Sequence, residues 1–197
     1  MKLVEASREK VQAYVIFGNG ALDKRVFKTI ASKFNHKVVL STPFIEHLTG
    51  LSEALKAIIK LMDYITLPFT YIIVIDREHV ESEEYLRGVT KEYGFEIKDF
   101  TKIDEYAYML EVKRGVKTSR IYMAINGFKK SIEENLAQVI ELFYGEKVDP
   151  SKDGIKKWLQ SKNISDIELA QKADERTFPG IISAIKRFLE DISKAVH

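Results

Sequence analysis

The segment YVIFGNGALDKRVFKTIASK, residues 14–33, changes its hydrophobic pattern at a pair of glycines. Before the glycines, residues 14–17 form an uninterrupted apolar run, which is typical of a buried strand. After them, apolar residues recur at helical spacing, at Leu22, Val26, Phe27 and Ile30. The segment therefore predicts a strand, a tight turn and a helix.

The same order of elements is predicted twice more. Residues 37–40, KVVL, indicate a second strand, and residues 46–64 indicate a helix with one apolar face. Residues 71–75, YIIVI, give the clearest strand pattern, without alternation because both faces of a central parallel strand are covered. A helix that ends near Gly94 is expected to follow. Strands that alternate with helices predict an α/β fold with a doubly wound, mainly parallel sheet in three Rossmann-like layers.

The chain after Gly94 has a less regular pattern. The elements predicted there are a short strand at 95–100, a hairpin of strands at 107–112 and 120–125, and a helix that a capping box opens at Ser131 and that runs to residue 143. From residue 145 onward the pattern is helical. We therefore expect an α/β domain at 1–144 and a helical C-terminal extension at 145–197 that packs on the same core.

The composition excludes several classes of protein. The chain has 197 residues, of which 45% are hydrophobic and 30% charged, enough apolar surface for one folded core. It has no cysteine, which excludes disulfides and thiolate metal sites. No segment has the pattern of a signal peptide or the ~18 uninterrupted apolar residues of a membrane span, so we expect a cytoplasmic protein with no membrane partner. Frequent Lys, Glu and Ile without Cys is usage typical of a hyperthermophile.

The charge balance restricts the partners. The 31 basic and 29 acidic residues leave a net charge of +2, so there is no broad basic surface of the kind that binds duplex DNA. A nucleic acid or a nucleotide is therefore expected only at a local site, which in an open parallel sheet lies beyond the carboxyl ends of the strands. Two turns are expected to meet there. Residues 18–23 offer backbone N–H groups and a helix N-terminus, which suit an anion, and residues 76–78 offer two carboxylates, which suit Mg²⁺.

The turn at residues 18–23 departs from two common phosphate-binding motifs. No Gly-Lys-Ser/Thr follows its glycines, which excludes a P-loop. Gly18-x-Gly20 is half of the dinucleotide fingerprint, but Asp23 stands where a third glycine or alanine lets the helix pack closely. A nicotinamide site is therefore not expected.

The segment around this turn resembles the opening of the Toprim (topoisomerase-primase) fold, in which the first strand ends in Glu-Gly-x-x-Asp before a helix. Gly20 and Asp23 match this motif, and Asn19 stands in place of the glutamate. Residues 71–78 are similar to the second Toprim motif, an apolar strand that ends in Asp-x-Asp, with Glu78 in place of the second aspartate. The order of the later segments is similar to that of small stand-alone archaeal and bacterial Toprim-like proteins related to overcoming-lysogenization-defect nucleases.

The resemblance implies a nuclease-like, Mg²⁺- or Mn²⁺-dependent phosphoryl transfer on nucleic acid or nucleotide phosphodiesters. The residues expected to carry it are Asn19, Asp23, Asp76 and Glu78 as catalytic residues, Asp76, Glu78 and Glu134 as metal ligands, and Gly18, Gly20 and Lys172 as phosphate contacts. Because an amide cannot exchange a proton as a glutamate does, we expect Asn19 to impair catalysis. Glu78 keeps the carboxylate charge, so we expect metal binding to survive more easily than turnover.

Each of these residues also has a purely structural interpretation. Asp76 can cap the helix that follows it, and Asp23 can interact with the dipole of its own helix. Glu134 can belong to the capping box, and Lys172 can face solvent. Two other functions stay open: a non-catalytic binding or assembly module of the same fold, and a metal-dependent nucleotide-sugar transferase, whose Asp-x-Asp-like motif also ends a strand.

Overall fold

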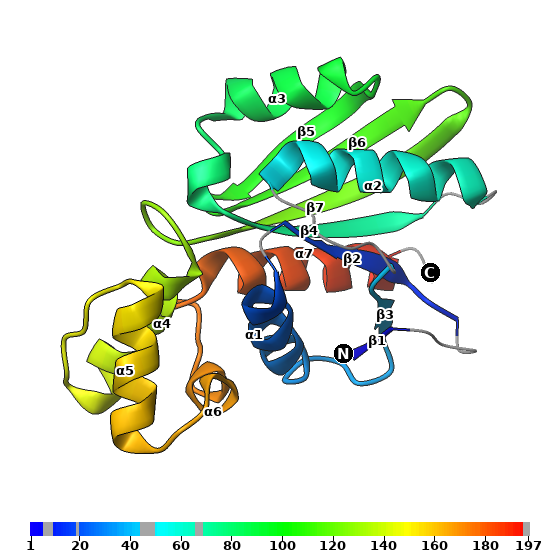
Figure 1. Cartoon of the computed structure of the whole chain (residues 1–197). Coiled ribbons are helices and arrows are strands. Elements are labelled where there is room, and N and C mark those ends of the chain that lie inside the picture. Colours follow the sequence, from blue (N-terminus) through cyan, green and yellow to red (C-terminus); the bar gives the residue numbers. More distant parts are fainter. Residues whose placement is uncertain (6–9, 19, 44–49, 66–68, 195–197) are drawn as a thin grey trace.

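The computed structural model describes residues 1–5, 10–18, 20–43, 50–65 and 69–194, which form a mixed α/β fold around one sheet (Figure 1). The seven strands of this sheet are β1 (Lys2–Val4), β2 (Ala13–Phe17), β3 (Val39–Ser41), β4 (Thr70–Asp76), β5 (Glu96–Asp104), β6 (Ala107–Arg114) and β7 (Lys117–Asn126). Their spatial order is β1-β3-β2-β4-β7-β6-β5. The first five in this order are parallel, and β6 and β5 are added antiparallel at one edge. The predicted α/β class with a mainly parallel sheet is confirmed.

Helices cover both faces of the sheet. The described residues contain seven α-helices, α1 (Ala21–Ala31), α2 (Gly50–Tyr64), α3 (Glu83–Glu92), α4 (Ile132–Tyr144), α5 (Lys152–Lys162), α6 (Asp166–Gln171) and α7 (Pro179–Lys194), and one 3₁₀ turn, η1 (Arg77–His79). Helices α1 and α7 lie on one face, and α2 and α3 lie on the other (Figure 1). None of the helices within the described ranges is long and apolar enough to cross a membrane.

Strand β4 is the centre of the core. Ile72 and Val74 belong to the apolar cluster on the α1 and α7 side, and Ile73 and Ile75 belong to the cluster on the α2 and α3 side. All four side chains are fully buried. The uninterrupted apolar run predicted a strand covered on both faces, and this prediction is confirmed.

The helices α4, α5 and α6 lie beyond the carboxyl ends of the strands, next to α1 (Figure 1). Trp158 of α5, Leu169 of α6 and Phe188 of α7 belong to the same apolar cluster as Phe27 of α1. Helix α6 contacts both α1 and α4. The C-terminal helices therefore share an apolar core with the first strand-helix unit.

The edges of the sheet differ from the sequence prediction. Strand β1 was not predicted, because its three residues are too few to show a pattern. Strand β5 has nine residues instead of the predicted six. It is an edge strand with five charged residues and two irregularities in its register with β6, so its apolar alternation is weak. Helix α2 begins at Gly50, and residues 44–49, where its start was predicted, lie outside the described residues.

Candidate functional site

The winding of the sheet reverses between β2 and β4. Strand β3 lies on one side of β2 and β4 lies on the other, and the helices that follow β2 and β3, α1 and α2, cover opposite faces. Ligands of doubly wound sheets bind at this reversal, beyond the carboxyl ends of the strands. The carboxyl ends of β2, β4 and β7 are adjacent here, and they place a cluster of buried polar side chains at this edge.

Asp23 and Asn126 form the centre of this cluster. Asp23 lies in the first turn of α1 and is 2% exposed, and Asn126 ends β7 and is 1% exposed. The Asn126 Nδ2 donates a hydrogen bond to Asp23 Oδ1 at 2.8 Å. Burial raises the pKa of Asp23 from 3.8 to about 6, although the hydrogen bond from Asn126 acts in the opposite direction. The fold therefore holds a carboxylate of raised pKa at the predicted site.

Asp76 ends β4 next to Asn126, its partner in the parallel β4–β7 register. It is 6% exposed, and its Oδ1 accepts a hydrogen bond from the N–H of Ile132 at 3.1 Å. Ile132 is the first residue of α4. Asp76 thus caps α4, whereas its side chain forms no capping bond with the 3₁₀ turn that directly follows it. Asp23 is therefore bonded to Asn126, and Asp76, which pairs in register with Asn126, is bonded to the start of α4.

Glu134 is held by the loop between β7 and α4. Its Oε2 accepts hydrogen bonds from the backbone N–H groups of Phe128, Lys129 and Lys130 at 2.8, 2.7 and 2.9 Å. Partial burial raises the pKa of Glu134, but these hydrogen bonds outweigh it, and the pKa lies below its ordinary value. This oxygen therefore already accepts three hydrogen bonds from the loop. The capping box predicted at Ser131 does not form among the described residues, because the Ser131 hydroxyl donates to Glu133 Oε2 and accepts no capping hydrogen bond from the backbone of α4.

The two glycines of the first turn have different environments. The N–H of Gly18 donates to Val74 O at 2.9 Å, so this N–H serves the sheet and not a phosphate. A Cβ at Gly18 would lie 2.7 Å from Ile75 Cγ2. Gly20 is the N-cap of α1 with a φ of 108°, which requires glycine, and no described atom lies within 4 Å of where its Cβ would be. Among the described residues, the start of α1 is therefore open at Gly20. Asn19 lies outside the described residues.

Two predicted site residues lie away from the buried cluster. Glu78 is exposed in η1, and its backbone N–H donates to Lys130 O at 3.0 Å. Lys172 is exposed at the end of α6, and its Nζ lies 5.7 and 5.5 Å from the ring centres of Phe143 and Tyr144. These aromatic residues end α4, whereas Asp76 contacts its beginning, so Lys172 does not join the carboxylates.

A Mg²⁺ ion fits part of this arrangement. Within the described ranges, no three His, Asp or Glu side chains gather closely enough to enclose a metal. Mg²⁺ commonly keeps several waters and is bound through one or two carboxylates and substrate phosphates. Asp76 supplies a hard oxygen donor of this kind at the carboxyl edge, and the exposed carboxylate of Glu78 lies on the turn that adjoins it. The residues therefore suit a hydrated Mg²⁺ shared with a substrate, and not an ion enclosed by the protein alone.

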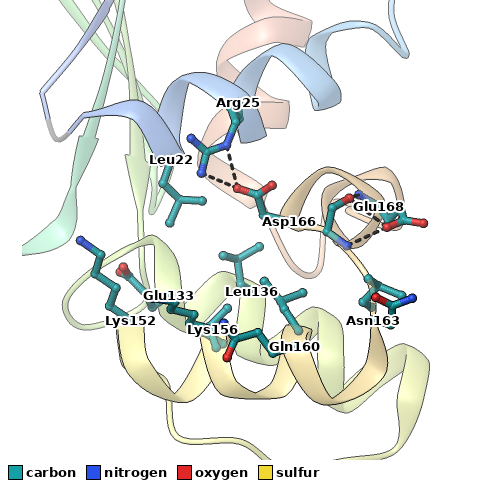
Figure 2. Close-up of a pocket in the computed structure, with 14 residues that line it drawn as sticks. Leu22, Arg25, Glu133, Leu136, Lys152, Lys156, Gln160, Asn163, Asp166 and Glu168 are labelled. Carbon is teal, nitrogen blue, oxygen red and sulfur yellow. Dashed lines mark hydrogen bonds and ion pairs between the residues drawn. The ribbon is translucent and has the colours of Figure 1, made fainter.

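A cavity of about 610 Å³ lies beside the cluster, between α1, α4, α5 and α6 (Figure 2). Leu22 and Glu133 line it, and they are sequence neighbours of the site residues Asp23 and Glu134. Sequence reasoning missed this cavity because its walls come from four separate helices. The signal that could have indicated it is the four-residue spacing along α5 of Lys152 and Lys156 beside that of Ile155 and Leu159.

Comparison of the chain with models of protein families, with curated proteins and with solved structures finds no match.

Proposed function

We propose that the carboxyl edge of the sheet is the site of a Mg²⁺-dependent phosphoryl transfer on nucleic acid or nucleotide phosphodiesters, in a protein of Toprim-like build. The observation that carries this proposal is the junction at Asn126, which donates to Asp23 and pairs in register with Asp76. Two buried carboxylates are thereby collected at the point where the winding of the sheet reverses, which is where this class of fold binds phosphorylated ligands.

The residues have separate roles in this proposal. Asp76 would hold the metal, and Glu78, which is exposed on the adjoining turn, would be its second carboxylate. The start of α1 at Gly20 would bind a phosphate through backbone N–H groups of the first helical turn. Asp23 and Asn126 would hold that turn against β7. Bound Mg²⁺ supplies a Lewis acid for a phosphate oxygen and lowers the pKa of a bound water.

A non-catalytic binding module of the same fold is the second candidate. Two observations favour it: Asp23 accepts from Asn126, and Asp76 accepts from the N–H of Ile132, so both carboxylates already have hydrogen-bond partners within the fold. The amide at Asn19 also removes the acid–base group that the resemblance assigns to this position.

The test is a calorimetric titration with Mg²⁺ and Mn²⁺, followed by cleavage assays on single- and double-stranded DNA and RNA. The variant is Asp76→Asn, which keeps an oxygen for the Ile132 N–H but loses the charge. The control is Glu81→Gln, which removes an exposed carboxylate outside the cluster. Metal binding and cleavage that only Asp76→Asn abolishes would support phosphoryl transfer.

Other results separate the alternatives. Metal or nucleic-acid binding without cleavage would favour the binding module. Cleavage by the Asn19→Glu variant would then show that the wild type lacks the acid–base group at this position. Binding of sugar nucleotides with no affinity for DNA or RNA would favour the nucleotide-sugar transferase. If neither the wild type nor any variant binds Mg²⁺ or Mn²⁺, the phosphoryl-transfer proposal is refuted.

A further inference from the structure

The cavity between α1 and α5 has an aliphatic interior. Its volume of about 610 Å³ lies within the range of small-molecule sites. The apolar side chains that line it are Leu22 of α1, Leu136 of α4, Ile155 and Leu159 of α5, and Ile164. They come from both the α1 side and the α5 side, so the cavity offers apolar surface to a ligand from more than one wall.

Two lysines supply the charge on the α5 side. Lys152 and Lys156 are exposed, line the cavity and lie one helical turn apart. Neither forms an ion pair with a described residue. By contrast, Arg25 on the facing wall is held by Asp166 at 2.6 Å. The two lysines are therefore the cations of this cavity that are available to an anion.

Polar groups follow one another along the length of the cavity (Figure 2). Lys152 and Glu133 lie at the end nearest Leu22, which adjoins the open start of α1. Gln160 and Asn163 lie further along α5, and each side-chain amide offers a donor and an acceptor. The rise along α5 from Lys152 to Gln160 is about 12 Å. An elongated ligand would therefore meet Lys152 at one end, Lys156 one turn further along α5, and the amides toward the other end.

We propose that this cavity binds the nucleoside part of a phosphorylated nucleoside, with its phosphate toward Lys152 and Lys156 and its base between the aliphatic walls. A base has polar edges that the amides of Gln160 and Asn163 can pair with, and a sugar has hydroxyls that can donate to the Glu133 carboxylate. A simple alkyl phosphate has no base edge or sugar hydroxyl that could pair with these side chains. The inference rests on the proposed function, since it names the substrate class of the adjoining site.

The test is calorimetry with AMP, GMP, CMP and UMP, with inorganic phosphate and decyl phosphate as comparison ligands. EDTA is present throughout, so binding in the cavity is measured without the metal. The variant is the double substitution Lys152→Ala/Lys156→Ala, and the control is Lys157→Ala, an exposed lysine of the same helix that does not line the cavity. Melting curves check that all the proteins stay folded.

We expect at least one nucleotide to bind more tightly than inorganic phosphate and decyl phosphate. The double variant should bind it about tenfold or more weakly, because it loses charge-assisted hydrogen bonds, while Lys157→Ala should bind as the wild type does. Gln160→Ala should change the preference among the four bases.

Three results would overturn the inference: equal affinity for inorganic phosphate, tighter binding of decyl phosphate, or an affinity that the double variant leaves unchanged. Absence of nucleotide binding would overturn it too. None of these results contradicts the proposed function as long as Mg²⁺ binding depends on Asp76. Conversely, a protein that binds no Mg²⁺ but binds a nucleotide in EDTA would contradict the proposed function and support the nucleotide site in the cavity.

Discussion

Asp76 Oδ1 accepts a hydrogen bond from the N–H of Ile132, 56 residues further along the chain. The carboxylate that ends the central strand thereby fixes the start of α4, which also carries Glu133 and Glu134. The same side chain is the first candidate ligand of the proposed metal. Asp76 therefore has a structural role and a proposed metal-binding role, and substitutions can separate the two.

Replacement of Asp76 should distinguish its capping role from its charge. Asp76→Ala leaves the buried N–H of Ile132 without this acceptor and should lower the free energy of unfolding by about 1–2 kcal/mol. Asp76→Asn keeps an oxygen at this position and should cost less. Urea denaturation of both variants measures the difference. Equal losses in the two variants would contradict the capping role.

Asp23 should make stability depend on pH in the direction opposite to a salt-bridged aspartate. Its pKa is raised by burial from 3.8 to about 6, so the folded protein holds the proton more tightly than the unfolded chain does. The resulting stabilisation is full below the ordinary pKa and is lost as the pH rises through about 6.

Asp23→Asn removes this pH dependence, because the amide stays neutral and its oxygen can still accept from Asn126. The variant should exceed the wild type in free energy of unfolding by about 2–3 kcal/mol near pH 7 and by little near pH 4. Urea denaturation across this pH range is the measurement. A difference that stays constant with pH would show that Asp23 titrates normally.

Glu134 should order the loop that joins β7 to α4. Glu134→Ala removes the acceptor of three backbone N–H groups, and we expect faster amide hydrogen exchange at Phe128, Lys129 and Lys130. Glu133→Ala is the matched control, because Glu133 accepts from the Ser131 hydroxyl and not from these amides. Unchanged exchange in Glu134→Ala would refute this role.

Two glycines should respond in opposite ways to alanine. Gly18→Ala places a Cβ 2.7 Å from Ile75 Cγ2 and should lower the free energy of unfolding by about 1–3 kcal/mol. Gly88 lies inside α3 with no atom within 4 Å of its Cβ position among the described residues, so Gly88→Ala should raise it by about 0.5–1 kcal/mol. Thermal melting compares the two, and a loss at Gly88 would be contrary to this account.

Local patterns predicted the parts of the fold that depend on neighbouring residues. The run at 71–75 and the strand-turn-helix at 14–33 have strong periodicity, and both predictions are confirmed. They also placed Asp23 and Asp76 at one edge of the sheet, because parallel strands end on the same side. The capping box at Ser165 likewise depends on four consecutive residues, Ser-Asp-Ile-Glu, and the structure forms it.

Contacts between distant residues were not accessible in this way. The partner of Asp76 was expected in the next few residues, but it is Ile132, brought near by the pairing of β4 with β7. The local pattern assigns no role to Asn126, although its amide joins β7 to α1. The cavity depends on how four helices pack beyond the sheet, which periodicity does not specify.

The most direct test of the proposed metal site is NMR of the ¹⁵N-labelled protein with Mn²⁺, whose unpaired electrons broaden nearby amide signals. The account predicts broadening at Gly20, Asp23 and Asn126, and none at Lys117, which lies about 30 Å away at the other end of β7. Asp76→Asn should restore the sharp signals. Broadening elsewhere, or broadening that Asp76→Asn leaves unchanged, would contradict the central claim that this edge of the sheet binds the metal.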